Sequence, residues 1–150
     1  MPSQQTTLLF GVATPGVSRR GLREFAGRLE KQVAGGRPFT CLVTTDAELR
    51  RLNQQFRKKD YPTDVLSFPC ASEAQNEALG EIAISLARAR TQAAEYGHTV
   101  PQEIQILMLH GLLHLLGMDH ESDNGRMSRA EKKWRVALGL PPSLTERTRS

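Results

Sequence analysis

The sequence has little cysteine, few aromatic residues and no long uninterrupted apolar segment. Its two cysteines, Cys41 and Cys70, are too few for a disulfide framework, so we expect a reduced, cytoplasmic protein. The longest apolar stretch, residues 104–118, is interrupted by histidine and is shorter than the roughly 20 residues that span a bilayer. The N-terminus shows neither the basic leader nor the small-residue cleavage site of a secretion signal. We therefore expect no membrane association and no export.

The scarcity of aromatic side chains bears on how the chain could bind nucleic acid. Phe, Trp and Tyr make up 5% of the residues, which disfavours a platform of stacked bases of the kind found in RNA-recognition sheets. The remaining composition, with 39% apolar and 24% charged residues, is typical of a globular protein and excludes collagen-like or largely disordered chains. The length predicts one domain over residues 1–140, followed by a flexible tail over residues 141–150.

Charge is distributed unevenly along the chain. Residues 1–60 carry a net charge of +6, residues 61–125 carry −7 and residues 126–150 carry +5. Clustered positive charge attracts polyanions, because neutralising phosphates releases their counterions. The alternative is that the two basic blocks are ordinary solvated helix faces. If nucleic acid binds, we expect its backbone to supply most of the contact.

Apolar periodicity and helix-capping signals predict the order of the elements. We expect strands at residues 6–12, 39–43, 64–68 and 79–85, and helices at residues 17–33, 45–56, 86–96, 99–117 and 128–138. Four helix starts carry a capping residue, namely Thr45, Ser85, Thr99 and Ser128. This pattern predicts a single α+β domain, with a mixed sheet of about four strands packed against helices. The candidate metal site described next would lie at the C-terminal end of one of these helices.

Three of the four histidines fall within the segment HGLLHLLGMDH, residues 110–120. His110 and His114 are four residues apart, so on a helix their Cβ atoms lie about 5–6 Å apart on one face. Both imidazoles can then reach one metal ion at about 2.0–2.1 Å. Gly117 allows the chain to leave the helix with a positive φ and to bring back His120 as a third ligand. Three protein ligands leave a fourth position for water, which is typical of a catalytic Zn²⁺ site, and another divalent transition metal stays open.

The alternative for these histidines is burial in the core. Three neighbouring buried imidazoles would each need a hydrogen-bond partner, so the metal site is the favoured interpretation. The spacing matches that of zinc proteases with the motif H-E-x-x-H, whose glutamate is the general base. Gly111 occupies the glutamate position here, so peptide hydrolysis is the weaker interpretation. His98 is assigned no role.

A second group of candidate residues is basic. Arg57, Lys58 and Lys59 lie at the end of a predicted helix and the start of a loop. The planar guanidinium of arginine matches the oxygens of a phosphate and stabilises charge that develops on them during hydrolysis. The alternative is favourable termination of the preceding helix by basic residues, worth about 0.3–1 kcal/mol.

Three segments, FRKKDYPTDVLSF, LGEIAIS and HGLLHLLGMDH, occur in this order. Together they resemble the YbeY family of metal-dependent endoribonucleases, also called rRNA maturation factors, over roughly residues 40–140. The resemblance implies a single α+β domain in which the three histidines of the last segment hold one Zn²⁺ ion. It assigns catalysis to Arg57. Two positions depart from the family pattern: Met118 stands where tyrosine is common, and Glu81 where aspartate is common.

The resemblance also implies a function. The expected activity is metal-dependent cleavage of single-stranded RNA, in maturation of the 3′ end of small-subunit rRNA and in ribosome quality control. The expected partners are an rRNA precursor and the ribosome or ribosomal proteins. In the expected mechanism metal-activated hydroxide attacks a phosphodiester, Arg57 stabilises the developing charge, and Lys58 and Lys59 add backbone affinity. Asp119 either orients a metal ligand or is a turn residue.

Two other function classes stay open at this point. One is a metallohydrolase that acts on a peptide or a small molecule. The other is a non-enzymatic, ribosome-associated RNA-binding protein whose metal braces the end of the helix.

Overall fold

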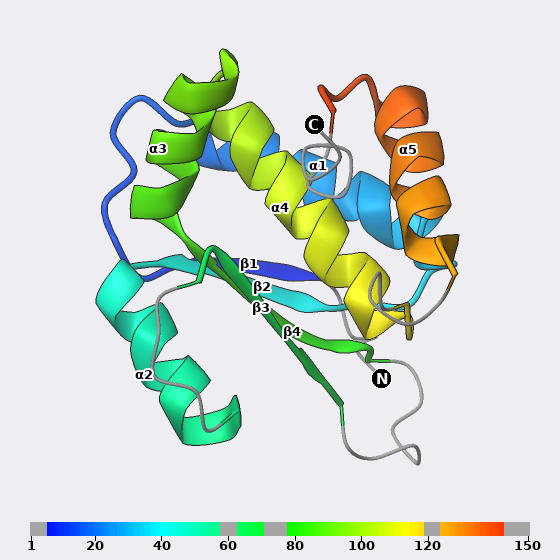
Figure 1. The fold of residues 1–150 in the computed structure, drawn as a ribbon, viewed down its shortest axis with the longest axis horizontal. Helices are drawn as coiled ribbons and strands as arrows, with labels where there is room; N and C mark the ends of the chain where they lie inside the picture. Colours follow the sequence, from blue (N-terminus) through cyan, green and yellow to red (C-terminus); the bar gives the residue numbers. More distant parts are fainter. Residues whose placement is uncertain (1–5, 58–62, 71–77, 119–123, 143–150) are drawn as a thin grey trace.

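The computed structural model describes residues 6–57, 63–70, 78–118 and 124–142. These residues form four strands and five helices, arranged as in Figure 1. The strands are β1 (Thr7–Phe10), β2 (Thr40–Thr44), β3 (Val65–Pro69) and β4 (Gly80–Ser85). The helices are α1 (Arg19–Gln32), α2 (Asp46–Arg57), α3 (Leu86–Tyr96), α4 (Val100–Leu115) and α5 (Arg126–Leu138).

The strands form one mixed sheet in the order β1-β2-β4-β3. β1 and β4 both run parallel to β2, whereas β3 pairs antiparallel with β4. The helix α1 connects the parallel strands β1 and β2. The predicted α+β class and the four-stranded mixed sheet are therefore confirmed.

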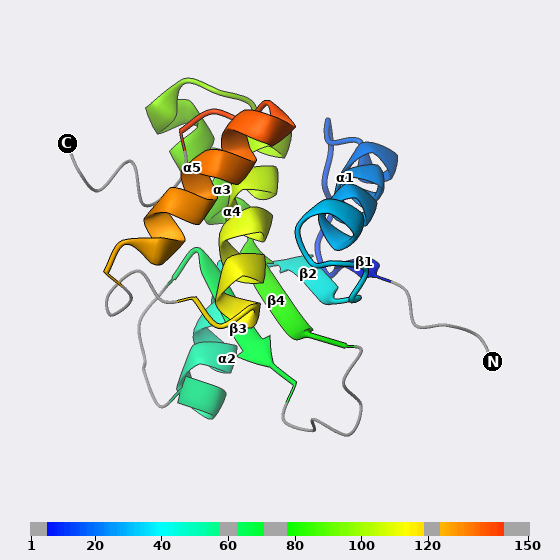
Figure 2. The ribbon, with the colours of Figure 1, turned by 90° about the vertical axis from the view of Figure 1, so that its right-hand side faces the viewer.

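The two faces of the sheet are covered differently. α1 and α4 pack on one face, with α3 and α5 against α4, whereas α2 lies on the opposite face (Figures 1 and 2). Because side chains alternate along a strand, Cys41, Val43, Ile82 and Ile84 enter the core beneath α1 and α4. Leu66 and Ala83 point the other way and pack beneath α2 with Leu49.

The helix α4 is buried on nearly every side. Its apolar residues from Ile104 to Leu113 are fully buried, because the sheet, α1, α3 and α5 all contact it. This burial explains the long apolar segment of the sequence, since a helix that is hydrophobic all round belongs in a core. Within the described residues, none of the helices combines the length and the apolar character needed to cross a membrane.

Most of the predicted helix ends are confirmed. Thr99 and Gln102 form a complete capping box at the start of α4, and the Ser85 hydroxyl caps α3. After α4, Gly117 adopts a φ of +93°, and the Met118 N–H donates to the Leu113 carbonyl oxygen, which is the hydrogen bond of a Schellman motif.

The predicted start of the last helix is wrong. α5 begins at Arg126, with Gly125 as its N-cap in the left-handed conformation and without a side-chain cap hydrogen bond. Ser128 therefore lies inside the first turn. Glu131 stands three residues after Ser128, where a capping box has its glutamate, but it is buried and contacts α4.

Gly111 allows α4 to approach the sheet closely. A Cβ atom at this position would lie 2.8 Å from Ile82 Cγ2 and 3.2 Å from Ser67 Oγ. The Ser67 hydroxyl donates a 2.9 Å hydrogen bond to the Gly111 carbonyl oxygen. A side chain at residue 111 would thus point into β3 and β4, which leaves no room for the glutamate that a zinc protease carries there.

We expect Gly111→Ala to destabilise the protein. Overpacking against the stiff, buried Ile82 side chain costs about 1–3 kcal/mol, which outweighs a helix-propensity gain of at most about 1 kcal/mol. The matched control is Gly27→Ala in α1, where an added Cβ meets nothing within 4 Å and should stabilise the helix. Urea denaturation of both variants measures the difference, and equal stabilisation by both would contradict the close packing.

Candidate metal centre

Two of the predicted metal ligands lie together on the last two turns of α4. The ring centroids of His110 and His114 are 4.8 Å apart, with an angle of 75° between the ring planes. His110 is buried and His114 is partly exposed. The i, i+4 spacing therefore produces the predicted shared face, with one imidazole accessible from outside.

A carboxylate from α5 fixes the orientation of His110. His110 Nδ1 is hydrogen-bonded to Glu131 Oε2, and the Glu131 side chain is fully buried. With a carboxylate as acceptor, Nδ1 carries the proton, which leaves the lone pair on Nε2. Histidines that bind metals commonly donate their other ring N–H to a carboxylate in this way, which sets the tautomer and raises the basicity of the ligand.

Sequence reasoning missed Glu131 as part of the site. The capping pattern at Ser128 predicts a helix start, and the spacing of the same segment contains a second signal. Met127, Glu131 and Leu138 are buried at intervals of four and seven residues, so the acid lies on the apolar face of α5. An acidic residue at an inward position of a basic helix needs a buried partner, and that observation predicts a role inside the protein.

The two described donors, His110 and His114, suit a metal ion. Two imidazoles on one helix face, one of them oriented by a carboxylate, are the chemistry that Zn²⁺ and neighbouring divalent metals select. Within the described ranges no cluster of three His, Cys, Asp or Glu side chains is found, and the third predicted ligand, His120, lies outside those ranges. Asp119 lies outside them too.

The predicted basic group is described only at its first residue. Arg57 is the last residue of α2, while its side chain, Lys58 and Lys59 lie outside the described residues. The ring of the preceding residue, Phe56, packs edge-on against Phe68 of β3, with centroids 5.6 Å apart.

The end of α2 and the histidine-bearing part of α4 meet the same strand. Phe56 contacts Phe68, and Gly111 accepts the hydrogen bond from Ser67. Ser67 and Phe68 are consecutive residues of β3, which is the last strand in the described part of the sheet. The residues next to Arg57 and His110 thus touch opposite faces of one outer strand.

The other candidate ligands lie elsewhere. His98 precedes α4 and contacts the buried Glu103, with 2.6 Å between Nε2 and Oε1. Cys41 is buried beneath α1, and this burial raises the pKa of its thiol far above the ordinary value, so it is an inert core residue. Cys70 is exposed at the end of β3.

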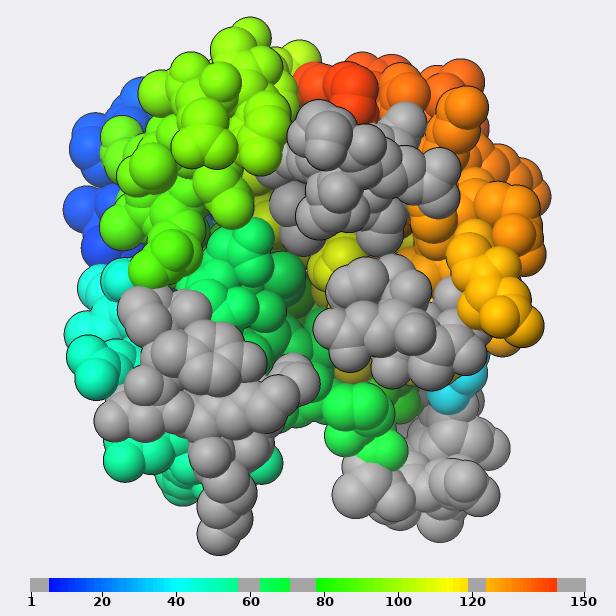
Figure 3. Space-filling view, viewed as in Figure 1, coloured from blue at the N-terminus to red at the C-terminus, as the bar shows by residue number. Residues whose placement is uncertain are grey.

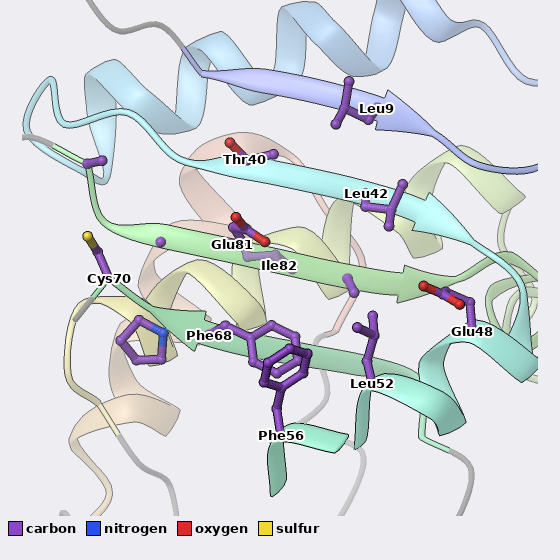
Figure 4. A pocket seen from close by; sticks show the side chains of 14 residues that line it. Leu9, Thr40, Leu42, Glu48, Leu52, Phe56, Phe68, Cys70, Glu81 and Ile82 are labelled. Carbon is purple, nitrogen blue, oxygen red and sulfur yellow. The ribbon is translucent and has the colours of Figure 1, made fainter. Parts of the chain in front are cut away.

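An apolar groove lies on the opposite face of the sheet, beside α2 (Figure 4). Its volume is about 590 Å³, and its walls include Leu9, Leu42, Leu52 and Phe56. Glu81, one of the two departures from the family pattern, points into it. The groove contains neither His110 nor His114, so it is distinct from the candidate metal centre.

We expect Glu131→Ala to destabilise the protein even without metal, because the His110 N–H loses its buried acceptor. The cost of an unsatisfied buried donor is about 1–3 kcal/mol. Glu131→Gln keeps an acceptor oxygen and nearly the same volume, so its loss should be smaller. Urea denaturation in the presence of a chelator measures both, with the exposed neighbour Lys132→Ala as a control expected within about 0.5 kcal/mol of the parent. Equal stability of the three variants would contradict the hydrogen bond.

Comparison with known proteins identifies the family. The model of the family described as Endoribonuclease YbeY matches residues 22–139. An Endoribonuclease YbeY from Solibacter usitatus is 58% identical over 145 residues, which is 97% of this chain and 96% of the relative. The Endoribonuclease YbeY of Koribacter versatilis is 47% identical, over 89% of this chain and 86% of its own length.

A solved structure shares the fold. It is the solution structure of a protein from Thermotoga maritima, with a TM-score of 0.60 and 30% sequence identity, over 86% of each chain. The family match extends further toward the N-terminus than the three motif segments, since it includes most of α1. On the evidence of its motifs, its fold and these relatives, the chain belongs to the YbeY endoribonuclease family.

Proposed function

We propose that the protein is a metal-dependent endoribonuclease that cleaves single-stranded RNA. The observation that carries the proposal is the pair His110 and His114 on one face of α4, with His110 oriented by Glu131, in a chain whose relatives are named Endoribonuclease YbeY. The resemblance extends the proposal to rRNA precursors as substrate, to contacts with the ribosome, and to a cytoplasmic site of action.

The proposed metal ligands are His110, His114 and His120. A bound Zn²⁺ ion supplies Lewis acidity, which activates water and polarises a phosphoryl oxygen. The chain's own contribution is to hold the ligands. The Glu131 carboxylate keeps the His110 proton on Nδ1. The Schellman turn at Gly117 ends α4 directly after His114 and Leu115. The sheet and the surrounding helices bury His110, which excludes water from that side of the site.

Arg57 is proposed as the catalytic residue that binds the scissile phosphate. Its guanidinium remains charged at every working pH and matches two phosphate oxygens. Phe56 and Gly111 contact consecutive residues of β3. This proximity supports the role, because a long side chain at the end of α2 needs only to pass the outer strand β3 to reach the histidines of α4. Lys58 and Lys59 are proposed to add affinity for neighbouring phosphates.

The packing of Gly111 argues against peptide hydrolysis. In the protease motif, the residue after the first histidine supplies the general base. Here that position faces Ile82 and Ser67 with no space for a side chain. A metallopeptidase on this framework would need its base from a different element.

We expect Arg57→Ala to lower the rate of RNA cleavage by about 10²–10³-fold, as for loss of one charge-stabilising donor in a transition state. Its metal content, measured by elemental analysis of the same preparation, should equal that of the parent. Arg57→Lys keeps the charge without the planar fork and should recover part of the rate. Unchanged cleavage by Arg57→Ala would remove this residue from the mechanism.

His114→Ala provides the complementary test. Because it removes a proposed ligand, we expect both metal content and cleavage to be lost together, whereas Arg57→Ala should lose cleavage alone. His114 is partly exposed, so the substitution should be tolerated by the fold, which circular dichroism can confirm. Full metal content in His114→Ala, or metal-dependent turnover of peptides without RNA cleavage, would overturn the proposed function.

A further inference from the structure

The exposed surface of α5 carries charge of one sign. Arg126, Arg129, Lys132 and Lys133 are all exposed, and we call these four residues the α5 basic face. The one acidic residue of α5, Glu131, is fully buried against His110. The helix therefore presents cations to solvent and uses its carboxylate inside the protein.

Few contacts within the described residues engage the charged groups of these side chains. Within the described part of the chain, Arg126, Lys132 and Lys133 make no ion pair, and Arg129 donates to the Asn124 carbonyl oxygen at 3.1 Å. Lys133 Nζ lies 5.0 Å from the centre of the Trp134 ring, a contact that leaves its ammonium group at the surface. Four like charges on one helix repel each other by a few tenths of a kcal/mol per pair, a cost that a polyanionic ligand removes.

The other basic helix, α1, differs in this respect. Arg19 and Arg23 lie over the Phe10 ring at 4.3 and 5.3 Å, and both donate to backbone carbonyl oxygens of the N-terminal segment. Arg20 pairs with Glu24 at 3.4 Å. Much of the positive charge of α1 is thus engaged with α1 itself and with neighbouring strand and loop residues.

α5 lies next to the candidate metal centre. The Glu131–His110 hydrogen bond joins α5 directly to the histidine-bearing part of α4. α5 and α1 lie on opposite sides of α4 (Figure 2). In the space-filling view of Figure 3, α5 (orange) borders the part of α4 (yellow) that reaches this surface. α5 is therefore beside the candidate metal centre, with its basic face on the solvent side of the helix, away from Glu131, whereas α1 is across α4 from the centre.

We propose that the α5 basic face binds the phosphate backbone of single-stranded RNA on one side of the cleavage site. The inference rests on the proposed function for the identity of the polyanion. Arg126, Arg129 and Lys133 follow each other at a rise of about 4.5–6 Å along the helix, so the strand meets a row of cations. The shortage of aromatic side chains agrees with recognition through phosphates rather than stacked bases.

The test is the salt dependence of RNA binding by full-length protein. The probe is a fluorescently labelled, single-stranded 2′-O-methyl RNA, which keeps every phosphate charge and blocks the 2′-hydroxyl groups. Fluorescence anisotropy at several salt concentrations compares the parent with Lys132→Gln/Lys133→Gln. Loss of two phosphate contacts should reduce the steepness of log affinity against log salt by about 1.4. If the two proteins bind equally at about 1 M salt, this difference makes the variant bind about 25-fold more weakly at about 0.1 M salt.

Two matched variants control for net charge and for side-chain identity. Arg28→Gln/Lys31→Gln removes two exposed charges from α1 and should leave the slope unchanged. Lys132→Arg/Lys133→Arg keeps the charges on α5 and should bind as the parent does. An equal loss of RNA affinity in the α1 and α5 variants, or no loss in either, would contradict RNA binding by the α5 basic face. If the parent cleaves RNA while the α5 variant keeps the parent slope, this inference fails and the proposed function stands; if the parent neither binds nor cleaves RNA, the proposed function itself fails.

Discussion

The close contact between α4 and strands β3 and β4 determines where the histidines lie. At Gly111 the helix backbone meets Ile82 and Ser67 with no intervening side chain, and the Ser67 hydroxyl bonds to the Gly111 carbonyl oxygen. Interiors this densely packed hold neighbouring side chains in fixed rotamers. The flanking residue His110 is therefore fixed in the core and bonded to Glu131 of α5, and the partly exposed His114 follows one turn later.

This contact also explains why His110 and His114 have the spacing of a zinc protease without its glutamate. The spacing of the two histidines fixes only their shared helix face. Which chemistry accompanies them depends on what the intervening positions face, and here those positions are used for packing. The basic groups that suit a phosphodiester are found on other elements. They lie at the end of α2, on the other face of the sheet, and on α5, which packs against α4. Fold and charge distribution thus separate the two chemistries more clearly than the histidine spacing does.

Much of the fold could be predicted from local sequence signals. The strands, the capping box at Thr99 and the left-handed turn at Gly117 follow from periodicity and from backbone chemistry within a few residues. The start of α5 could not be predicted this way, because Glu131 satisfies a capping pattern locally while a tertiary contact with His110 determines its actual place. The same limit applies to the site: the histidine pair is a local feature, but its carboxylate partner comes from 21 residues further along the chain.

The reliance of His110 on α5 has a consequence for the order in which the protein matures. The acceptor of its imidazole proton is on the last helix of the described chain, so it leaves the ribosome after every strand of the sheet has been made. Until α5 docks, the imidazole lacks the partner that selects its tautomer, even if α4 has already packed on the sheet. A nascent chain thus gains an oriented His110 imidazole only after α5 has been made, later than every strand of the described sheet.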